Sequence, residues 1–163
     1  MYIGLLILAA CMACGAYLDI RYRRLPNWLS GVTLVAGLGY AAITGWDSVL
    51  AWHAASFALA LAAGMGIFAL GMWGGGDGKF FAASAAWFPL ALLPMQALAI
   101  SMVGLALVIW WFVRRGASLR KGKGPPMVPY GVAIALGTLA VFALPLTQPS
   151  YSQSILSGDM SSR

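Results

Sequence analysis

The stretch Gly74-Gly75-Gly76-Asp77-Gly78-Lys79 places one carboxylate in a glycine-rich turn between two long apolar runs. A charge at the edge of a bilayer is costly and tends to mark a functional site. The glycines permit backbone conformations closed to other residues and let another segment approach closely. A solvated turn capped by Asp77 and a phosphate-binding loop are the alternatives, but the Walker spacing is absent.

The composition around this turn is that of an integral membrane protein. The 163 residues are 61% hydrophobic and only 9% charged, far from the balance of a soluble domain. Four acids occur, and all of them are Asp: Asp19, Asp47, Asp77 and Asp159. The net charge of +6 comes from basic residues that flank apolar runs, so we expect no nucleic-acid partner.

Six apolar segments predict an all-α polytopic membrane protein with six transmembrane helices. They cover residues 2–18, 28–45, 49–73, 80–93, 97–113 and 128–146. A single helix over residues 80–113 would be about 50 Å long, too long for a hydrocarbon core of about 30 Å. We therefore expect Pro94-Met95-Gln96 to separate the fourth and fifth spans. Residues 1–146 form the membrane domain, and the polar tail at 147–163 is predicted to be disordered.

The basic residues predict the orientation. Nine of the ten Lys and Arg residues follow the first, third or fifth span. The positive-inside rule places these loops in the cytoplasm and both termini on the exterior, periplasmic side. Asp47 and Asp159 then face outward, which leaves Asp19 and Asp77 as the only cytoplasmic acids.

These two acids each lie at a helix end and can converge. Two close carboxyl groups cannot both ionise cheaply, so one keeps a proton near neutral pH. The ionised group can then take a proton from water while the protonated group polarises a scissile carbonyl. The alternative for Asp19 is an ion pair with Arg23, four residues further along the helix.

A third element, Pro129-Tyr130-Gly131, begins the last span on the same side of the membrane as the acids. Such a start can leave backbone groups free to align an extended substrate strand; an ordinary helix start with an interfacial Tyr is the alternative. Cys11 and Cys14 form a C-x-x-C spacing, but the single His, His53, leaves a zinc site without enough ligands. We expect no metal.

Three motifs together resemble the type IV prepilin peptidase family of membrane aspartyl proteases, most closely its short form that serves tight-adherence (Flp) pili. The motifs are Asp19 with Arg24, Pro26 and Asn27; G-x-G-D at Gly74, Gly76 and Asp77 followed by Lys79; and Pro129-Tyr130-Gly131 with Ala133 and Gly137. The resemblance extends over nearly the whole chain up to the tail.

The resemblance implies that Asp19 and Asp77 are the catalytic pair. The residues it implies for substrate binding or support are Gly74, Gly76, Lys79, Pro129, Tyr130 and Gly131. It further implies removal of an Flp-type prepilin leader after a glycine, at the cytoplasmic face of the bacterial inner membrane, with no cofactor and with membrane lipids as the surroundings. Longer members carry an N-terminal region with paired cysteine motifs and methylate the new pilin terminus. This chain shows no such region, so we predict peptidase activity without methyltransferase activity.

Two other functions fit the same composition. A small ion- or proton-coupled transporter would carry ionisable residues near the bilayer midplane and often shows repeated halves. A non-catalytic subunit of a secretion machine would not require both acids in these motifs. Both acids here lie at one edge and no repeat is present, which favours the peptidase.

Overall fold

The computed structural model describes residues 2–44, 48–115 and 129–144. Within these residues the chain forms six α-helices and one short 3₁₀ helix, and no strand. They are α1 (Tyr2–Tyr22), α2 (Asn27–Thr44), α3 (Ser48–Ala69), α4 (Gly75–Ala85), η1 (Leu90–Leu92), α5 (Leu93–Arg115) and α6 (Tyr130–Phe142). The prediction of an all-helical protein is confirmed.

Three helical segments of the described chain are long and apolar enough to cross a membrane: Ile3–Tyr22, Val49–Ala69 and Leu90–Arg114. The remaining helices are shorter, with 18 residues in α2, 11 in α4 and 13 in α6. The protein is therefore a helical membrane protein that combines three long apolar helices with three shorter α-helices in the part of the chain that the structure describes.

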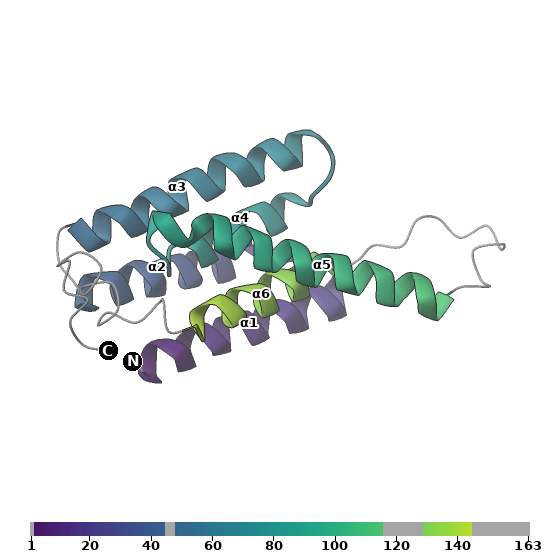
Figure 1. Ribbon diagram of the computed structural model, residues 1–163, viewed down its shortest axis with the longest axis horizontal. Coiled ribbons are helices and arrows are strands. Elements are labelled where there is room, and N and C mark those ends of the chain that lie inside the picture. The colour runs from purple at the N-terminus through teal and green to yellow at the C-terminus, as the bar shows by residue number, and fades with distance from the viewer. Residues whose placement is uncertain (1, 45–47, 116–128, 145–163) are drawn as a thin grey trace, which may run out of the picture.

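The helices run lengthwise beside one another, and the chain reverses between successive helices (Figure 1). The short helix α4 lies in the middle of the bundle, where it contacts α3, α2 and α6. On one side α6 also packs against α1 and α5. The last turn of α1 and the first turns of α4 and α6 consequently meet at one end of the bundle.

Close approach of α3 and α4 depends on two glycines. A Cβ atom on Gly64 would lie 3.0 Å from the Cα and carbonyl oxygen of Gly78, and a Cβ on Gly78 would lie 3.0 Å from the carbonyl oxygen of Gly64. Small residues of this kind let the backbones of membrane helices touch. The contact fixes the start of α4, and with it Asp77, against α3.

The predicted boundary between the fourth and fifth spans is wrong in its position. Helix α4 ends at Ala85, and the chain turns through the buried residues Trp87 and Phe88 and then Pro89. Helix α5 begins at Leu93, so Pro94-Met95-Gln96 lies inside its first turns rather than between helices. Proline is tolerated there because the first helical N–H groups have no partner within the helix.

A buried polar cluster joins three helices at the last turn of α4. The side-chain amide of Gln96 donates to the hydroxyl oxygens of Ser84 at 2.8 Å and Thr138 at 3.1 Å. All three side chains are fully buried. Hydrogen bonds of this type hold neighbouring membrane helices together, and here they connect α4, α5 and α6.

Candidate active site

Asp19 lies in the last turn of α1 and is almost completely buried, with 6% of its surface exposed. The N–H of Gly131 donates a hydrogen bond of 2.7 Å to its Oδ2 atom. Gly131 is the second residue of α6, so the carboxyl group faces the N-terminal end of that helix, where backbone N–H groups favour negative charge. A Cβ atom on Gly131 would lie 2.8 Å from the Cβ of Asp19, so only glycine fits at this distance.

Helix α1 ends at Tyr22, three residues after Asp19, because of the residues that follow. The N–H of Arg23 donates to the carbonyl oxygen of Asp19 at 3.0 Å, and Arg23 has a φ of 54°. This left-handed residue closes the helix in the αL manner usually left to glycine. Pro26 then prevents the helix from continuing. The guanidinium of Arg23 also exerts a Coulombic attraction on the Asp19 carboxyl group.

Asp77 is the third residue of α4 and lies at the same end of the bundle, outside the three long apolar segments. Its Oδ2 atom accepts a hydrogen bond of 3.2 Å from the N–H of Gly74, the residue that precedes the helix. A Cβ on Gly74 would lie 2.8 Å from that same oxygen. The carboxyl group thus folds back over the start of its own helix, and Gly74 leaves room for it.

The two carboxyl groups are close enough to influence each other. Burial and, second, the charge of Asp19 raise the pKa of Asp77 from 3.8 to about 6, against an opposing effect of the Gly74 hydrogen bond. Mutual repulsion of close carboxylates is the usual reason that one member of a pair keeps its proton. The structure therefore brings together the two acids that the sequence singled out.

Gly76, the second glycine of the G-x-G-D motif, contacts the loop between α1 and α2. A Cβ atom at this position would lie 2.9 Å from the carbonyl oxygen of Leu25 and 3.3 Å from its Cβ. The loop that follows Asp19 therefore packs against the residue next to Asp77. Sequence reasoning missed Leu25 because an apolar residue between Arg24 and Pro26 has no distinctive pattern.

Lys79 lies in α4, two residues after Asp77, and is exposed. Its ammonium group donates to the Oδ1 atom of Asn27 at 3.1 Å. Among the described residues it forms no ion pair with Asp77, and its charge is not a cause of the pKa shift of that acid. Lys79 thus ties α4 to the start of α2, a contact between residues 52 positions apart that the sequence does not reveal.

Tyr130 and Pro129 lie at the start of α6, with Pro129 directly before the helix. The ring of Tyr130 lies 6.1 Å from the ring of Trp73, which also makes an edge contact of 5.7 Å with Phe81. Trp73 therefore links the start of α6, which carries Gly131, to helix α4, which carries Asp77. The Gly131 N–H is engaged by Asp19 and is not free to pair with a substrate strand.

Two further polar residues lie away from the acids. His53 on α3 donates through Nδ1 to the carbonyl oxygen of Ala86 at 2.8 Å, at the opposite end of α4 from Asp77. Cys11 and Cys14 are free thiols within α1. In the described part of the chain no three His, Cys, Asp or Glu side chains gather where they could hold a metal ion.

A helical membrane protein that presents two interacting carboxyl groups at one end of its bundle has the groups needed for acid–base hydrolysis at a membrane surface. The sequence profile of the type IV leader peptidase family matches residues 6–109, well over half of the chain. The protein belongs to this family of membrane peptidases. Both acids lie inside the matched range, and the Pro129–Gly131 motif lies beyond it. Comparison with curated proteins and with solved structures gives no significant match.

Proposed function

We propose that the protein is an aspartic endopeptidase that removes the leader of Flp-type prepilins, with Asp19 and Asp77 as its catalytic pair. The observation that carries the proposal is the position of both acids at one end of the bundle, where burial and, second, the charge of Asp19 raise the pKa of Asp77 to about 6. Family membership supplies the reaction class. The position of both acids at one end of the bundle favours a peptidase over a transporter, whose ionisable site would lie at mid-depth.

In the proposed mechanism the pair holds one proton between its two carboxyl groups. In the active form Asp77 carries it, and this form is most populated below about pH 6, the value to which burial and the charge of Asp19 raise the pKa of Asp77. Asp19 keeps Oδ2 on the N–H of Gly131 and uses its other oxygen as the base for a water molecule. As the hydroxide forms and attacks the scissile carbonyl carbon, Asp77 donates its proton to the carbonyl oxygen. Asp19 then gives the proton it took from water to the leaving nitrogen as the C–N bond breaks, and Asp77 takes its proton back from the tetrahedral intermediate, which releases the new amino terminus and the leader carboxyl group.

The residues around the two acids are consistent with Asp19 as the base and Asp77 as the acid. The α1–α2 loop packs through Leu25 against Gly76 in the first turn of α4, and the hydrogen bond from Lys79 to Asn27 also joins α4 to this segment. Trp73 and Tyr130 close the other side. The nine basic residues at the odd-numbered loops favour the cytoplasmic face of the inner membrane as the place of cleavage. We further propose cleavage alone, without methylation of the product.

The test is co-expression with a tagged Flp-type prepilin and detection of a shorter product on a gel. Asp19→Asn and Asp77→Asn are each expected to abolish cleavage while the protein remains in the membrane fraction. Asp159→Asn, in the C-terminal tail, is the control and is expected to cleave normally. Cleavage that persists in either of the first two variants refutes the paired-acid mechanism. The mass of the product's amino terminus shows whether methyl transfer occurs.

A further inference from the structure

Arg23 has a backbone conformation that side chains rarely adopt. Its φ is 54°, and within residues 2–44, 48–115 and 129–144 the only other residue with a positive φ is Gly71. Glycine and asparagine are the usual residues at such a left-handed helix end, because a larger side chain crowds the following carbonyl oxygen. Strain of this kind persists where the surrounding structure imposes it, and it clusters at functional sites. The end of α1 therefore does not by itself explain an arginine here.

The charge of Arg23 acts on one of the two acids. The N–H of Arg23 donates to the carbonyl oxygen of Asp19 at 3.0 Å, which holds residue 23 one helical turn beyond the acid. The positive charge of Arg23 favours the ionised form of Asp19. The influences on Asp77 are burial, the charge of Asp19 and the N–H of Gly74, and Arg23 is not among them. The arginine thus distinguishes between two chemically identical carboxyl groups.

The helices packed around Asp19 supply no second cation. Helix α6 presents the N–H groups of Gly131 and Val132, which also favour the ionised form. Helix α4 presents Asp77, whose charge opposes a second ionised carboxyl group nearby, and Lys79 of the same helix influences neither acid. Helix α2 carries no charged side chain. In the part of the chain that the structure describes, one cation therefore acts on the pair.

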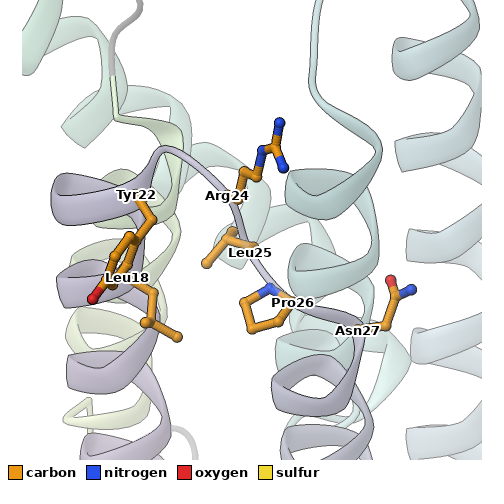
Figure 2. Close-up of a pocket in the computed structure, with 6 residues that line it drawn as sticks. All are labelled: Leu18, Tyr22, Arg24, Leu25, Pro26 and Asn27. Atoms are coloured by element: carbon orange, nitrogen blue, oxygen red, sulfur yellow. The ribbon is translucent and has the colours of Figure 1, made fainter.

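The two neighbouring arginines have different surroundings. The guanidinium of Arg21 lies 5.5 Å from the ring centre of Tyr22, and its charge is not among those that act on Asp19. Arg24 lies at the rim of a pocket of about 380 Å³ between α1 and α2. Figure 2 shows its guanidinium projecting away from the side chains of α1. Of these three arginines, only Arg23 acts on an acid.

We propose that Arg23 is a positioning residue of the paired acids: its left-handed backbone and its hydrogen bond to Asp19 place its charge near that acid, which assigns Asp19 as the base and Asp77 as the acid. The inference rests on the proposed function and explains why the proton of the pair lies on one particular member. A positive charge near Asp19 favours the arrangement in which Asp77 holds the proton. Without that charge, a larger fraction of the enzyme holds its base protonated.

The first test measures the protonation of Asp19 directly. The chain has four acidic residues, all of them Asp. Purified protein labelled with ¹³C at the aspartate carboxyl carbon therefore gives few side-chain signals, and Asp19→Asn identifies the one from Asp19. Arg23→Asn removes the charge and suits a left-handed position. In this variant the Asp19 signal is expected to change at a pH about half a unit higher than in the wild type. Arg23→Lys keeps the charge and should restore the wild-type titration.

The second test is the pH profile of kcat/KM for a purified Flp-type precursor. Arg23→Asn is expected to cleave about threefold more slowly than the wild type near pH 5 and at the same rate above about pH 8. The difference grows as the pH falls because protonation of Asp19 removes the base. Loss of the Asp77 proton at higher pH is the same in both proteins, since Arg23 does not act on Asp77.

Two controls separate this effect from net charge and from folding. Arg21→Gln removes the same charge two residues earlier and is expected to match the wild type in both tests. The unfolding midpoint of Arg23→Asn is expected to equal or exceed that of the wild type, because asparagine tolerates the left-handed conformation better than arginine.

An Asp19 titration that is unchanged in Arg23→Asn would overturn the inference, as would a loss of cleavage that is equal at all pH values. The same holds if Arg21→Gln reproduces the effects of Arg23→Asn, an outcome that identifies a general effect of net charge. Failure of the wild-type enzyme to cut any Flp-type precursor would overturn the proposed function, whereas a shifted titration in Arg23→Asn would still support the action of Arg23 on Asp19.

Discussion

Replacing Asp77 with Asn is expected to stabilise the protein at neutral pH even though it abolishes cleavage. The pKa of Asp77 is raised from 3.8 to about 6 in the folded protein. Between these values the native state holds a proton that the unfolded chain has lost, so stability falls as the pH rises through this range. Above it the folded protein carries an ionised carboxylate that burial and Asp19 oppose.

The size of the effect follows from the shift. About two pKa units correspond to at most about 3 kcal/mol. Asp77 is only partly buried, so solvent screening reduces the expected gain to about 1 kcal/mol. Asn keeps an oxygen that can accept the N–H of Gly74, so the start of α4 should be retained. A gain of this size raises the unfolding midpoint by about 2–4 °C in a protein of this length.

The assay is thermal unfolding in detergent, followed by Trp fluorescence at one fixed scan rate. The midpoints of the wild type and Asp77→Asn are compared from about pH 4 to pH 8. The difference between them should be largest above about pH 6 and should disappear near pH 4, because both proteins are then uncharged at residue 77. A less stable Asp77→Asn at pH 8, or a difference independent of pH, would refute the reasoning.

Three further outcomes follow from the site. The kcat/KM for cleavage of a purified precursor is expected to fall as the pH rises through about 6, because the pair loses its shared proton; a flat profile between about pH 5 and pH 8 would contradict that mechanism. Gly131→Ala places a Cβ 2.8 Å from the Cβ of Asp19 and is expected to slow cleavage on the order of 10²-fold. Its control is Gly104→Ala, whose Cβ meets its nearest neighbour at 3.7 Å and which should cleave normally; equal activity of the two would show that Asp19 does not depend on this fit. Gly76→Ala forces Leu25 away and is expected to lower the free energy of unfolding by about 1–3 kcal/mol and to reduce cleavage. Its control is Gly66→Ala, whose Cβ would meet nothing within 4 Å and which should leave stability and cleavage unchanged. Matching unfolding midpoints for the two variants would contradict the proposed packing.

Much of the helical layout could be predicted from the sequence, because apolar runs separated by charged or glycine-rich loops define membrane helices without knowledge of their packing. The six helices and their order follow from these runs. The position of Asp19 and Asp77 at one end also follows, since each acid lies where an apolar run stops or starts. The placement of both termini on the exterior side of the membrane stays a prediction.

The boundaries near Pro89 and Pro94 could not be predicted in the same way. Both prolines interrupt a single apolar run, and hydrophobicity alone does not say which of them stops a helix. Pro94 falls in the first turn of α5, where it costs no hydrogen bond. Gln96, taken for a loop residue, is instead fully buried between Ser84 and Thr138, because only tertiary packing supplies its partners.

The contacts around the acids could not be predicted from the sequence either. Lys79 binds Asn27, and Leu25 packs on Gly76, yet no pattern within either segment names the other. The motifs identified which residues matter but not what they touch. The case of Gly131 shows the difference, since its role in the structure is to donate to Asp19 rather than to present a free N–H.

The shortness of α4 has a consequence for how the protein is made. Its 11 residues extend over about 17 Å, roughly half of a hydrocarbon core, and its first turn carries a charge. Such a segment does not partition into lipid on its own. During synthesis its insertion into the membrane is therefore expected to be delayed until it packs against α2 and α3. Thr138 of α6, the last partner of its buried Ser84, emerges only near the end of translation. A ribosome stalled before α6 would therefore leave an incomplete bundle that membrane quality-control proteases can recognise.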